Sequence, residues 1–384
     1  MRTKFTVLTV LLVALSAVAA TPLAAGATQQ SGAQCSFPVS VTDATGTEVT
    51  LDEKPQRVTT LMPSATQIMW EIGGKEQVVG VGLPEYSTYL DGVESRTNVS
   101  AEGMGVSVEK IVGTDPDLVL APSGTPQETV EALREAGLTV YVYSDTTSVE
   151  DVKRDTTVTG KLTGNCEGAA EANAWMVANV DAAANATADA ERPRVIYPLG
   201  GGYVAGGETF IDSVISASGG TNVVAEAGLT GYPQLNDEKV IELEPEVIVV
   251  SDYPGPSVVR SEPYASTPAG ENNRTVTVDR NWINQPAPRS VVYATRNLTA
   301  GLHPEAAESA DFVAKSEIRA EANASADGGT GSDGGQSATD ASGDANADAD
   351  ADAEGETGAQ LPGFGVPAAV AALLASALLA RRRR

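Results

Sequence analysis

The sequence has few of the side chains that most often carry catalysis or bind metals. Its 384 residues include one histidine, His303, and two cysteines, Cys35 and Cys166. A zinc or manganese site normally draws on several His or Cys ligands, which this chain cannot supply. A Ser-His-Asp triad could form only through His303, which stands before Pro304 at the end of an expected helix, where a cation suits the helix dipole. We therefore expect no enzyme, no metal site and no cofactor.

Basic residues are also scarce. The chain has 25 Lys and Arg against 51 Asp and Glu, which gives a net charge of −26. A nucleic-acid-binding protein would need the opposite sign, so that class is excluded. The acidic residues are spread along the chain as well as clustered in one tail, which suits a protein kept soluble in concentrated salt. We interpret the source as a halophilic archaeon, with an ordinary acidic secreted protein as the alternative.

The N-terminal residues 1–27 are typical of a secretory signal peptide. Arg2 and Lys4 precede an apolar run, and small residues follow at 25–27. An exported chain with two cysteines favours one disulfide, between Cys35 and Cys166. Export also makes five Asn-x-Ser/Thr sequons candidate glycosylation sites. They are Asn98, Asn185, Asn273, Asn297 and Asn323.

The C-terminal region has two parts. Residues 323–360 are rich in Asp, Ala, Gly, Ser and Glu and are expected to be a disordered acidic linker. Residues 361–384 combine Pro-Gly-Phe, an apolar run and four final arginines, and the run just reaches the length that spans a bilayer. This tail resembles the Pro-Gly-Phe sorting signal of archaeal surface proteins, in which the helix is removed and a lipid attached. A plain membrane anchor is the alternative, and either one places the protein on the outer face of the cell membrane.

The central feature of the sequence is a stretch that occurs twice, at residues 107–121 and 236–250. In both copies Glu-Lys opens a short helix, and a Pro six residues after the Lys leads into an apolar, β-branched strand. Such strands, without alternation, are typical of parallel sheets buried on both faces. The repeat predicts an α/β fold with two similar Rossmann-like lobes.

The expected boundaries follow from this repeat. The N-terminal α/β lobe covers residues 36–147 and the C-terminal α/β lobe covers 193–322. Between them, residues 148–190 lack strand patterning and predict a helical connector with a possible break at Gly164-Asn165. The final helix is expected at Pro288 to Leu302, with a helical tail to about Ala322.

Aromatic residues make up only 5% of the chain, yet several stand beside Gly or Pro in loops that follow strands. Open α/β sheets place ligand sites there. Ordinary packing is the alternative for each residue taken alone, but together they predict a cleft for a large, partly flat ligand. The candidates are Tyr86, Tyr89, Tyr203, Tyr232 and Trp282, with Tyr253 nearby.

From about residue 39 to 305 the chain resembles the substrate-binding proteins of ABC importers for cobalamin, siderophores and haem. The resemblance rests on Tyr86-Ser87-Thr88-Tyr89, on 232–235 followed by Glu238, and on Trp282 with Pro288-Arg289. It implies a class III periplasmic-binding-protein fold, in which one long rigid helix joins the lobes. It also implies that Glu109 and Glu238 dock onto arginines of a permease dimer, which works with its ATPase subunits.

Within this family the resemblance is strongest to the cobalamin binders, so the expected ligand is cobalamin or a related corrinoid. Gly103 falls near a position where those members have Trp, which leaves the ligand open. A ferric siderophore is the first alternative, with Arg96, Arg260 and Arg280 available for an anion, and haem is another. A structural cell-surface protein is less expected, because adhesins are usually arrays of β-sandwiches. We expect a monomer when the protein is free.

Overall fold

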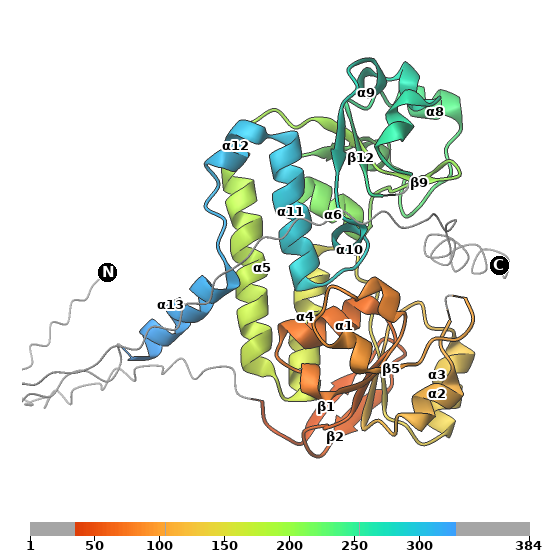
Figure 1. Ribbon diagram of the computed structural model, residues 1–384, viewed down its shortest axis with the longest axis vertical. Coiled ribbons are helices and arrows are strands. Elements are labelled where there is room, and N and C mark those ends of the chain that lie inside the picture. Colours follow the sequence, from red (N-terminus) through yellow and green to blue (C-terminus); the bar gives the residue numbers. More distant parts are fainter. Residues whose placement is uncertain (1–34, 104, 253, 328–384) are drawn as a thin grey trace, which may run out of the picture. The chain divides into compact units, whose positions relative to one another are not determined.

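The computed structural model describes residues 35–103, 105–252 and 254–327 (Figure 1). The expected signal peptide, most of the acidic linker, the C-terminal sorting segment and Tyr253 lie outside these residues. Within the described part of the chain, no helix has the length and apolar character needed to cross a membrane. Two parallel sheets form the centres of two lobes, and buried aliphatic side chains fill the space between the sheets and their helices.

A β-hairpin opens the N-terminal lobe. Strand β1 (Val39–Thr42) pairs antiparallel with β2 (Glu48–Leu51), as the alternating sequence predicts. The turn is held by the Asp43 carboxylate, which accepts hydrogen bonds from the backbone N–H groups of Thr45 and Thr47 at 2.9 and 3.0 Å. Arg134 pairs with the same carboxylate at 2.6 Å and ties the hairpin to the rest of the lobe.

The first sheet has five parallel strands in the order β5-β4-β3-β6-β7. They are β3 (Val58–Thr60), β4 (Val78–Val81), β5 (Thr97–Asn98), β6 (Leu118–Ala121) and β7 (Val140–Val142). The helices of this lobe are α1 (Pro63–Glu71), α2 (Val108–Gly113) and α3 (Gln127–Glu135). All four residues of β6 are buried, because helices cover both faces of the sheet.

The second sheet repeats the plan with four parallel strands in the order β11-β8-β12-β13. They are β8 (Arg194–Ile196), β11 (Thr221–Asn222), β12 (Val247–Val250) and β13 (Thr275–Thr277). Its helices are α6 (Phe210–Ala217), α7 (Val223–Glu226), α8 (Asp237–Glu242) and α9 (Pro268–Glu271), and a hairpin of β9 (Pro198–Gly200) and β10 (Tyr203–Val204) follows β8. Short 3-10 turns occur at Lys75–Gln77, Pro84–Tyr86, Val93–Ser95, Pro256–Arg260 and Tyr264–Ser266.

The duplication extends to details that the sequence pattern does not reveal. Asp115 and Glu244 hold equivalent left-handed backbone conformations, with φ of 48° and 45°, between the repeated helix and the strand. In the first lobe Arg57 Nε donates to the carbonyl of Asp115 at 2.7 Å. In the second lobe Arg194 donates to the carbonyl of Leu243 at 2.8 Å and to that of Glu244 at 3.4 Å. An arginine at the first strand of each lobe therefore stabilises the same strained turn.

The segment between the lobes contains two helices, α4 (Val149–Thr163) and α5 (Cys166–Ala186). The break falls at Gly164, whose φ of 69° ends α4 in the left-handed conformation. The two helices pack side by side, so α5 alone is the long bridging helix, with 21 residues and a length of about 30 Å (Figure 1). Cys35 and Cys166 form a disulfide, which fixes the start of the described chain to the first turn of α5.

The chain returns along α5 after the second sheet. Helix α10 (Arg280–Ile283) leads into α11 (Pro288–Leu302), which packs along α5, and α12 (Pro304–Glu308) and α13 (Lys315–Asp327) follow. His303 separates α11 from α12. It is buried, and its Nε2 lies 3.1 Å from the carbonyl oxygen of Gly219, so the only histidine has a packing role at the end of α11.

Candidate functional site

Aromatic rings from the two lobes meet at the start of α10. The ring of Tyr89, in the loop after the Pro84–Tyr86 turn, stands edge-on to that of Trp282 on α10, with centroids 4.8 Å apart and planes at 70°. Trp282 also contacts Tyr293 of α11, at 5.1 Å between centroids. These edge-on and tilted contacts are favourable for aromatic pairs. The structure thus brings together two of the five predicted ligand-binding residues, one from each lobe.

Hydrogen bonds across the lobes hold this aromatic group in place. The Tyr89 hydroxyl accepts a bond from Gln67 Nε2 at 2.6 Å and donates one to Gln285 Oε1 at 2.8 Å. Gln285 Nε2 in turn donates to the backbone carbonyl of Tyr86 at 2.8 Å. Gln67, on α1, also reaches α11, where its Nε2 donates to Ser290 Oγ at 2.9 Å. Burial raises the pKa of Tyr89 to about 12, so its hydroxyl keeps the proton that it donates to Gln285.

Two arginines lie over the tyrosine rings, and each is matched by a carboxylate. The Arg280 guanidinium is 5.8 Å from the centroid of the Tyr86 ring and pairs with Asp252 at 3.3 Å. The Arg289 guanidinium is 5.9 Å from the Tyr89 ring and pairs with Glu71, whose side chain is 3% exposed. Cation–π contacts of this kind are favourable near aromatic faces. Each of the two guanidinium groups thus has a carboxylate partner, although Arg289 shares Glu71 with Lys315.

Glu71 also connects the C-terminal segment to the junction of the lobes. Lys315, at the start of α13, donates to its carboxylate at 3.0 Å. Just before Lys315, the carbonyl of Val313 accepts bonds from Trp175 Nε1 and Asn179 Nδ2 of α5 at 3.0 and 3.1 Å. The segment that leads to the acidic linker is therefore fastened to α5 and to α1.

The remaining candidates are Tyr203, on strand β10, and Tyr232, on a loop of the same lobe. The backbone N–H of Val204 donates to the carbonyl of Pro233 at 3.1 Å, and that of Leu235 to the carbonyl of Gly202 at 2.9 Å. These bonds pair the β9-β10 hairpin with the loop that carries Tyr232. Tyr203, Tyr232 and Trp282 pack against one core cluster, and burial raises the pKa of Tyr232 to about 12. Trp282, the ring partner of Tyr89, thus shares this core cluster with Tyr203 and Tyr232.

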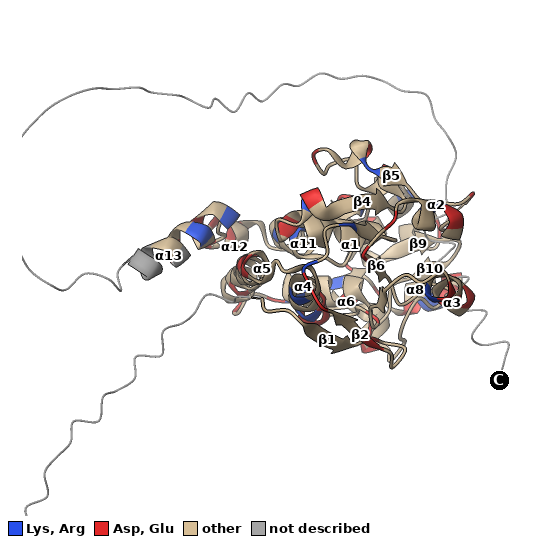
Figure 2. Cartoon of the chain, turned by 90° about the horizontal axis from the view of Figure 1, so that it is seen from below, with Lys and Arg blue, Asp and Glu red and all other residues tan. Residues whose placement is uncertain are grey.

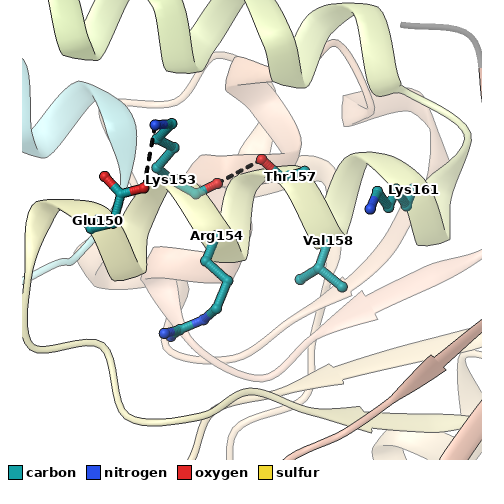
Figure 3. Close-up of a pocket in the computed structure, with 6 residues that line it drawn as sticks. All are labelled: Glu150, Lys153, Arg154, Thr157, Val158 and Lys161. Atoms are coloured by element: carbon teal, nitrogen blue, oxygen red, sulfur yellow. Dashed lines mark hydrogen bonds and ion pairs between the residues drawn. The ribbon is translucent and has the colours of Figure 1, made fainter. Parts of the chain in front are cut away.

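Two surface hollows are lined by other residues. One lies along α4, and Figure 3 shows the Glu150–Lys153 ion pair of 3.2 Å among the residues that line it. It is lined by Glu150, Lys153, Arg154, Thr157, Val158 and Lys161. A second one is lined by Ala182, Asn185, Ala186, Ser309, Ala310 and Asp311. Neither includes an aromatic residue. Among the described residues, no group of three or more His, Cys, Asp or Glu side chains could hold a metal ion.

The two repeated glutamates occupy matching positions. Glu109 follows Ser107, whose Oγ accepts from the N–H of Lys110 at 3.3 Å, and Glu238 follows Asn236, whose Oδ1 accepts from the N–H of Lys239 at 2.8 Å. Both glutamates are exposed, and neither carboxylate has a hydrogen-bond or ion-pair partner in the described part of the chain. Acidic positions, red in Figure 2, mark α2 and the neighbouring α3.

The five sequon asparagines are all exposed. Two of them make side-chain contacts: Asn98 Oδ1 accepts from the N–H of Ser100 at 2.8 Å, and Asn273 Oδ1 accepts from Arg260 Nε at 3.3 Å. Exposure makes the five positions accessible, and their modification stays a prediction.

Sequence reasoning missed four polar residues that join the lobes: Gln67, Glu71, Gln285 and Ser290. It names Arg280 only for an anionic ligand and Arg289 only as part of the family resemblance, and the structure adds their contacts with Tyr86 and Tyr89. Gln67 gives one usable signal, because a fully buried amide inside an apolar helical stretch requires partners. The other arginines considered for an anionic ligand lie elsewhere: Arg96 is over the Trp70 ring at 5.8 Å, and Arg260 contacts Asn273.

Two parallel α/β sheets bridged by one long helix, with aromatic loops at the junction, define a two-lobed binding protein. The family model described as "Periplasmic binding protein" matches residues 58–282, more than half of the chain, and the chain belongs to this family. It is a substrate-binding component of ABC import and is not an enzyme. A second model, the PGF-CTERM motif, matches residues 361–383 and marks an exported protein anchored at its C-terminus.

Particular relatives give a closer comparison. The chain is 42% identical over 300 residues to the cobalamin-binding protein of Halobacterium salinarum, covering 74% of this chain and 81% of the relative. It is 27% identical over 245 residues to the vitamin B12-binding protein of Vibrio parahaemolyticus, covering 62% and 87%. The solved structure of the haem-binding protein RhuT from Roseiflexus sp. RS-1 matches with a TM-score of 0.57 and 25% identity, covering 65% and 99%. The Helicobacter pylori CeuE structure matches with a TM-score of 0.61 and 20% identity, covering 71% and 91%, which supports the fold.

Proposed function

We propose that this protein captures cobalamin or a related corrinoid outside the cell and delivers it to a membrane permease. The observation that carries the proposal is the Tyr89–Trp282 contact, in which two of the aromatic residues expected to bind the ligand, one from each lobe, meet. A corrin is a large, partly flat macrocycle, and aromatic side chains offer it broad apolar surfaces. The similarity to a cobalamin-binding protein over 74% of the chain supports the same ligand class.

The charges near the aromatic residues favour a corrinoid over an anionic ferric siderophore. Such an anion needs cations that are free to pair with it. Of the three arginines considered for it, only Arg280 lies beside the aromatic group, and it already pairs with Asp252. The Arg289 cation also has an anionic partner, Glu71, which it shares with Lys315.

Haem is the second candidate, because several solved structures of similar fold are of haem-binding proteins. Haem iron in proteins is often held by a histidine. The only histidine of this chain is buried against the carbonyl of Gly219, so an axial ligand would have to come from another side chain, of which Tyr232 is the candidate among the predicted ligand-binding residues. Burial raises the pKa of Tyr232 to about 12, which disfavours the phenolate form that iron prefers. This chemistry ranks haem below a corrinoid.

The partner in delivery is an ABC permease dimer with its ATPase subunits. Glu109 and Glu238 face arginine clusters on the two halves of that dimer. Support comes from their exposure, their lack of partners among the described residues, and their equivalent places after the caps Ser107 and Asn236. A carboxylate in the first turn also stabilises a helix, by about 0.3–1 kcal/mol, but that alone does not require the same acid in both lobes.

Uptake of labelled cobalamin by cells tests this function. A strain without the protein should lose high-affinity uptake, and the intact chain should restore it. Glu109→Gln with Glu238→Gln should bind ligand normally yet restore little uptake, and the two Lys replacements should be worse because they add repulsion. Normal uptake with both double variants would refute the docking roles. Normal uptake without the protein would refute the function.

The finer features of the mature protein belong to the same proposal. The C-terminal helix is exchanged for a lipid on the outer face of the membrane, the five exposed sequons carry glycans, and the free protein is a monomer adapted to high salt. The excess of acidic residues, 51 Asp and Glu against 25 Lys and Arg, supports the adaptation to high salt. Mass spectrometry of protein taken from the cell surface tests the lipid and the glycans, since an intact chain ending at Arg384 without added sugar mass would contradict both.

A further inference from the structure

Three large hydrophobic side chains are exposed in the described part of the chain, and two of them occupy the same place in the two lobes. Val112 on α2 is 40% exposed and Ile241 on α8 is 39% exposed; Tyr293 on α11 is the third, at 39%. Val112 stands three residues after Glu109, and Ile241 stands three residues after Glu238. Residues three apart lie on the same face of a helix, one turn from each other. Each lobe therefore presents a carboxylate beside an exposed aliphatic side chain.

The packing of these helices does not require this exposure. Each helix already anchors itself through the preceding residue, because Ile111 is fully buried and Val240 is 2% exposed. A single exposed aliphatic residue is ordinary on a protein surface. Chance exposure does not explain why an aliphatic residue is exposed at the same position of both lobes. The lobes do differ at neighbouring positions: the residue that caps the helix is Ser107 in one lobe and Asn236 in the other.

We propose that Val112 and Ile241 are the apolar half of the surface that docks on the permease, each entering an apolar pocket beside the cation that pairs with the glutamate. This inference rests on the proposed function and adds to it the chemistry of the contact. The occupant is a partner with two matching sites, because the chain presents the same pair twice. It carries positive charge at each site, because the carboxylates of Glu109 and Glu238 are exposed and have no ion-pair partner among the described residues.

Salt concentration explains the use of an apolar contact here. Exposed ion pairs weaken as salt rises, since the Debye length falls to about 3 Å at 1 M. Burial of aliphatic surface is not screened in this way. In a chain with a net charge of −26, suited to concentrated salt, the glutamates would set orientation while the aliphatic pair would supply salt-resistant affinity.

The test measures binding of the purified protein to its permease in lipid nanodiscs at about 0.2 M and about 3 M potassium chloride, a range across which screening changes several-fold. Val112→Ser with Ile241→Ser should weaken binding about tenfold or more at both concentrations. Glu109→Gln with Glu238→Gln should weaken it strongly at low salt and much less at high salt. Ala170→Ser with Ala184→Ser, which makes apolar surface polar at two exposed positions of α5 outside the aromatic group, is the control and should bind the permease as the unchanged protein does.

The outcomes separate this inference from the function on which it rests. Cobalamin titration of the Ser variant should show unchanged affinity, which establishes that the variant is folded. If that variant then binds the permease as tightly as the unchanged protein while the Gln variant does not, the aliphatic pair has no role and the proposed function stands. If the unchanged protein itself shows no binding to the permease, both the inference and the delivery function are overturned.

Discussion

The Tyr89 ring meets the Trp282 ring at 4.8 Å across the junction of the two lobes. Close by, Gln67 of the N-terminal lobe donates to Ser290 of the C-terminal lobe at 2.9 Å. The residues expected to contact the ligand are thus the neighbours of those that hold the lobes together. Binding and the relative placement of the lobes should depend on the same small group of side chains.

Loss of an aromatic side chain from the site should weaken ligand binding. Tyr232→Ala and Trp282→Ala should each cost about 1–3 kcal/mol of binding free energy, as for aromatic anchors in buried sites. Phe312→Ala is a suitable control, because the Phe312 ring contacts the guanidinium of Arg296 on α11 and is not one of the predicted ligand-binding residues. Isothermal titration of the three variants gives the affinities. Unchanged affinity in both test variants, with folding intact, would remove these residues from the site.

The hydroxyl of Tyr89 should contribute to stability through its two bonds. Tyr89→Phe leaves Gln67 Nε2 without one acceptor and Gln285 Oε1 without its donor in a largely buried place. We expect the free energy of unfolding to fall by about 1–2 kcal/mol. Denaturant titration at constant salt measures it, with Tyr293→Phe as the control because that side chain is exposed. Equal losses in the two variants would contradict a specific role of the Tyr89 bonds.

The Cys35–Cys166 disulfide should be a large contribution to stability. It joins residues 131 positions apart. In the chain-entropy model, closing a loop of this length lowers the entropy of the unfolded chain and thereby stabilises the folded protein by about 4–5 kcal/mol, before any strain is subtracted. Replacing both cysteines by Ser should lower the free energy of unfolding by about that amount. Non-reducing peptide mapping of the unchanged protein should find the two peptides joined, and freely alkylated thiols in protein from the cell surface would count against the bond.

Asp155 should make stability depend on pH. Its side chain on α4 is almost fully buried. Burial raises the pKa of Asp155 to about 6, and this effect outweighs the hydrogen bond from Thr146 and the ion pair with Arg154, both of which lower the pKa. Because the folded state holds this proton more tightly than the unfolded chain, stability from this group is highest below pH 4 and falls as pH rises to about 6. Between pH 4 and pH 6 the free energy of unfolding should therefore fall by roughly 2–3 kcal/mol in the unchanged protein, and Asp155→Asn should abolish this fall.

Denaturant titrations from pH 4 to 7 measure this effect against Asp145→Asn, which removes an exposed carboxylate close to it along the chain. The account expects the Asp155→Asn variant to show a flatter pH profile and the control variant to keep the profile of the unchanged protein. The same slope in all three proteins would show that Asp155 titrates normally.

The sequence predicts the architecture because the fold depends on local patterns. Buried strands without alternation, the caps Ser107 and Asn236, and Gly164 after α4 all have signals within a few residues. The position of Trp70 on the apolar face of its helix predicts a core residue, and its ring packs, partly buried, against the core cluster of the N-terminal lobe. Its Nε1 donates to the carbonyl of Asp91 at 2.9 Å, a contact that the pattern does not reveal.

The site is less accessible from sequence because its contacts are long-range. Tyr89 and Trp282 are found by their places in loops and by family resemblance, and their contact is present in the structure. Arg289 and Glu71 could not be paired by any local rule, since they come from α11 and α1 of different lobes. The ligand-binding role of the five aromatic residues stays a prediction, because the sequence does not identify the ligand that they would contact.

Titration of the purified protein in high salt, by calorimetry with cyanocobalamin, a ferric siderophore and haem in turn, tests the central claim most directly. The account predicts one cobalamin per chain with much higher affinity than the other two compounds, and a large loss of that affinity in Trp282→Ala. Tight binding of the ferric siderophore or of haem, with no heat from cobalamin, would contradict the account.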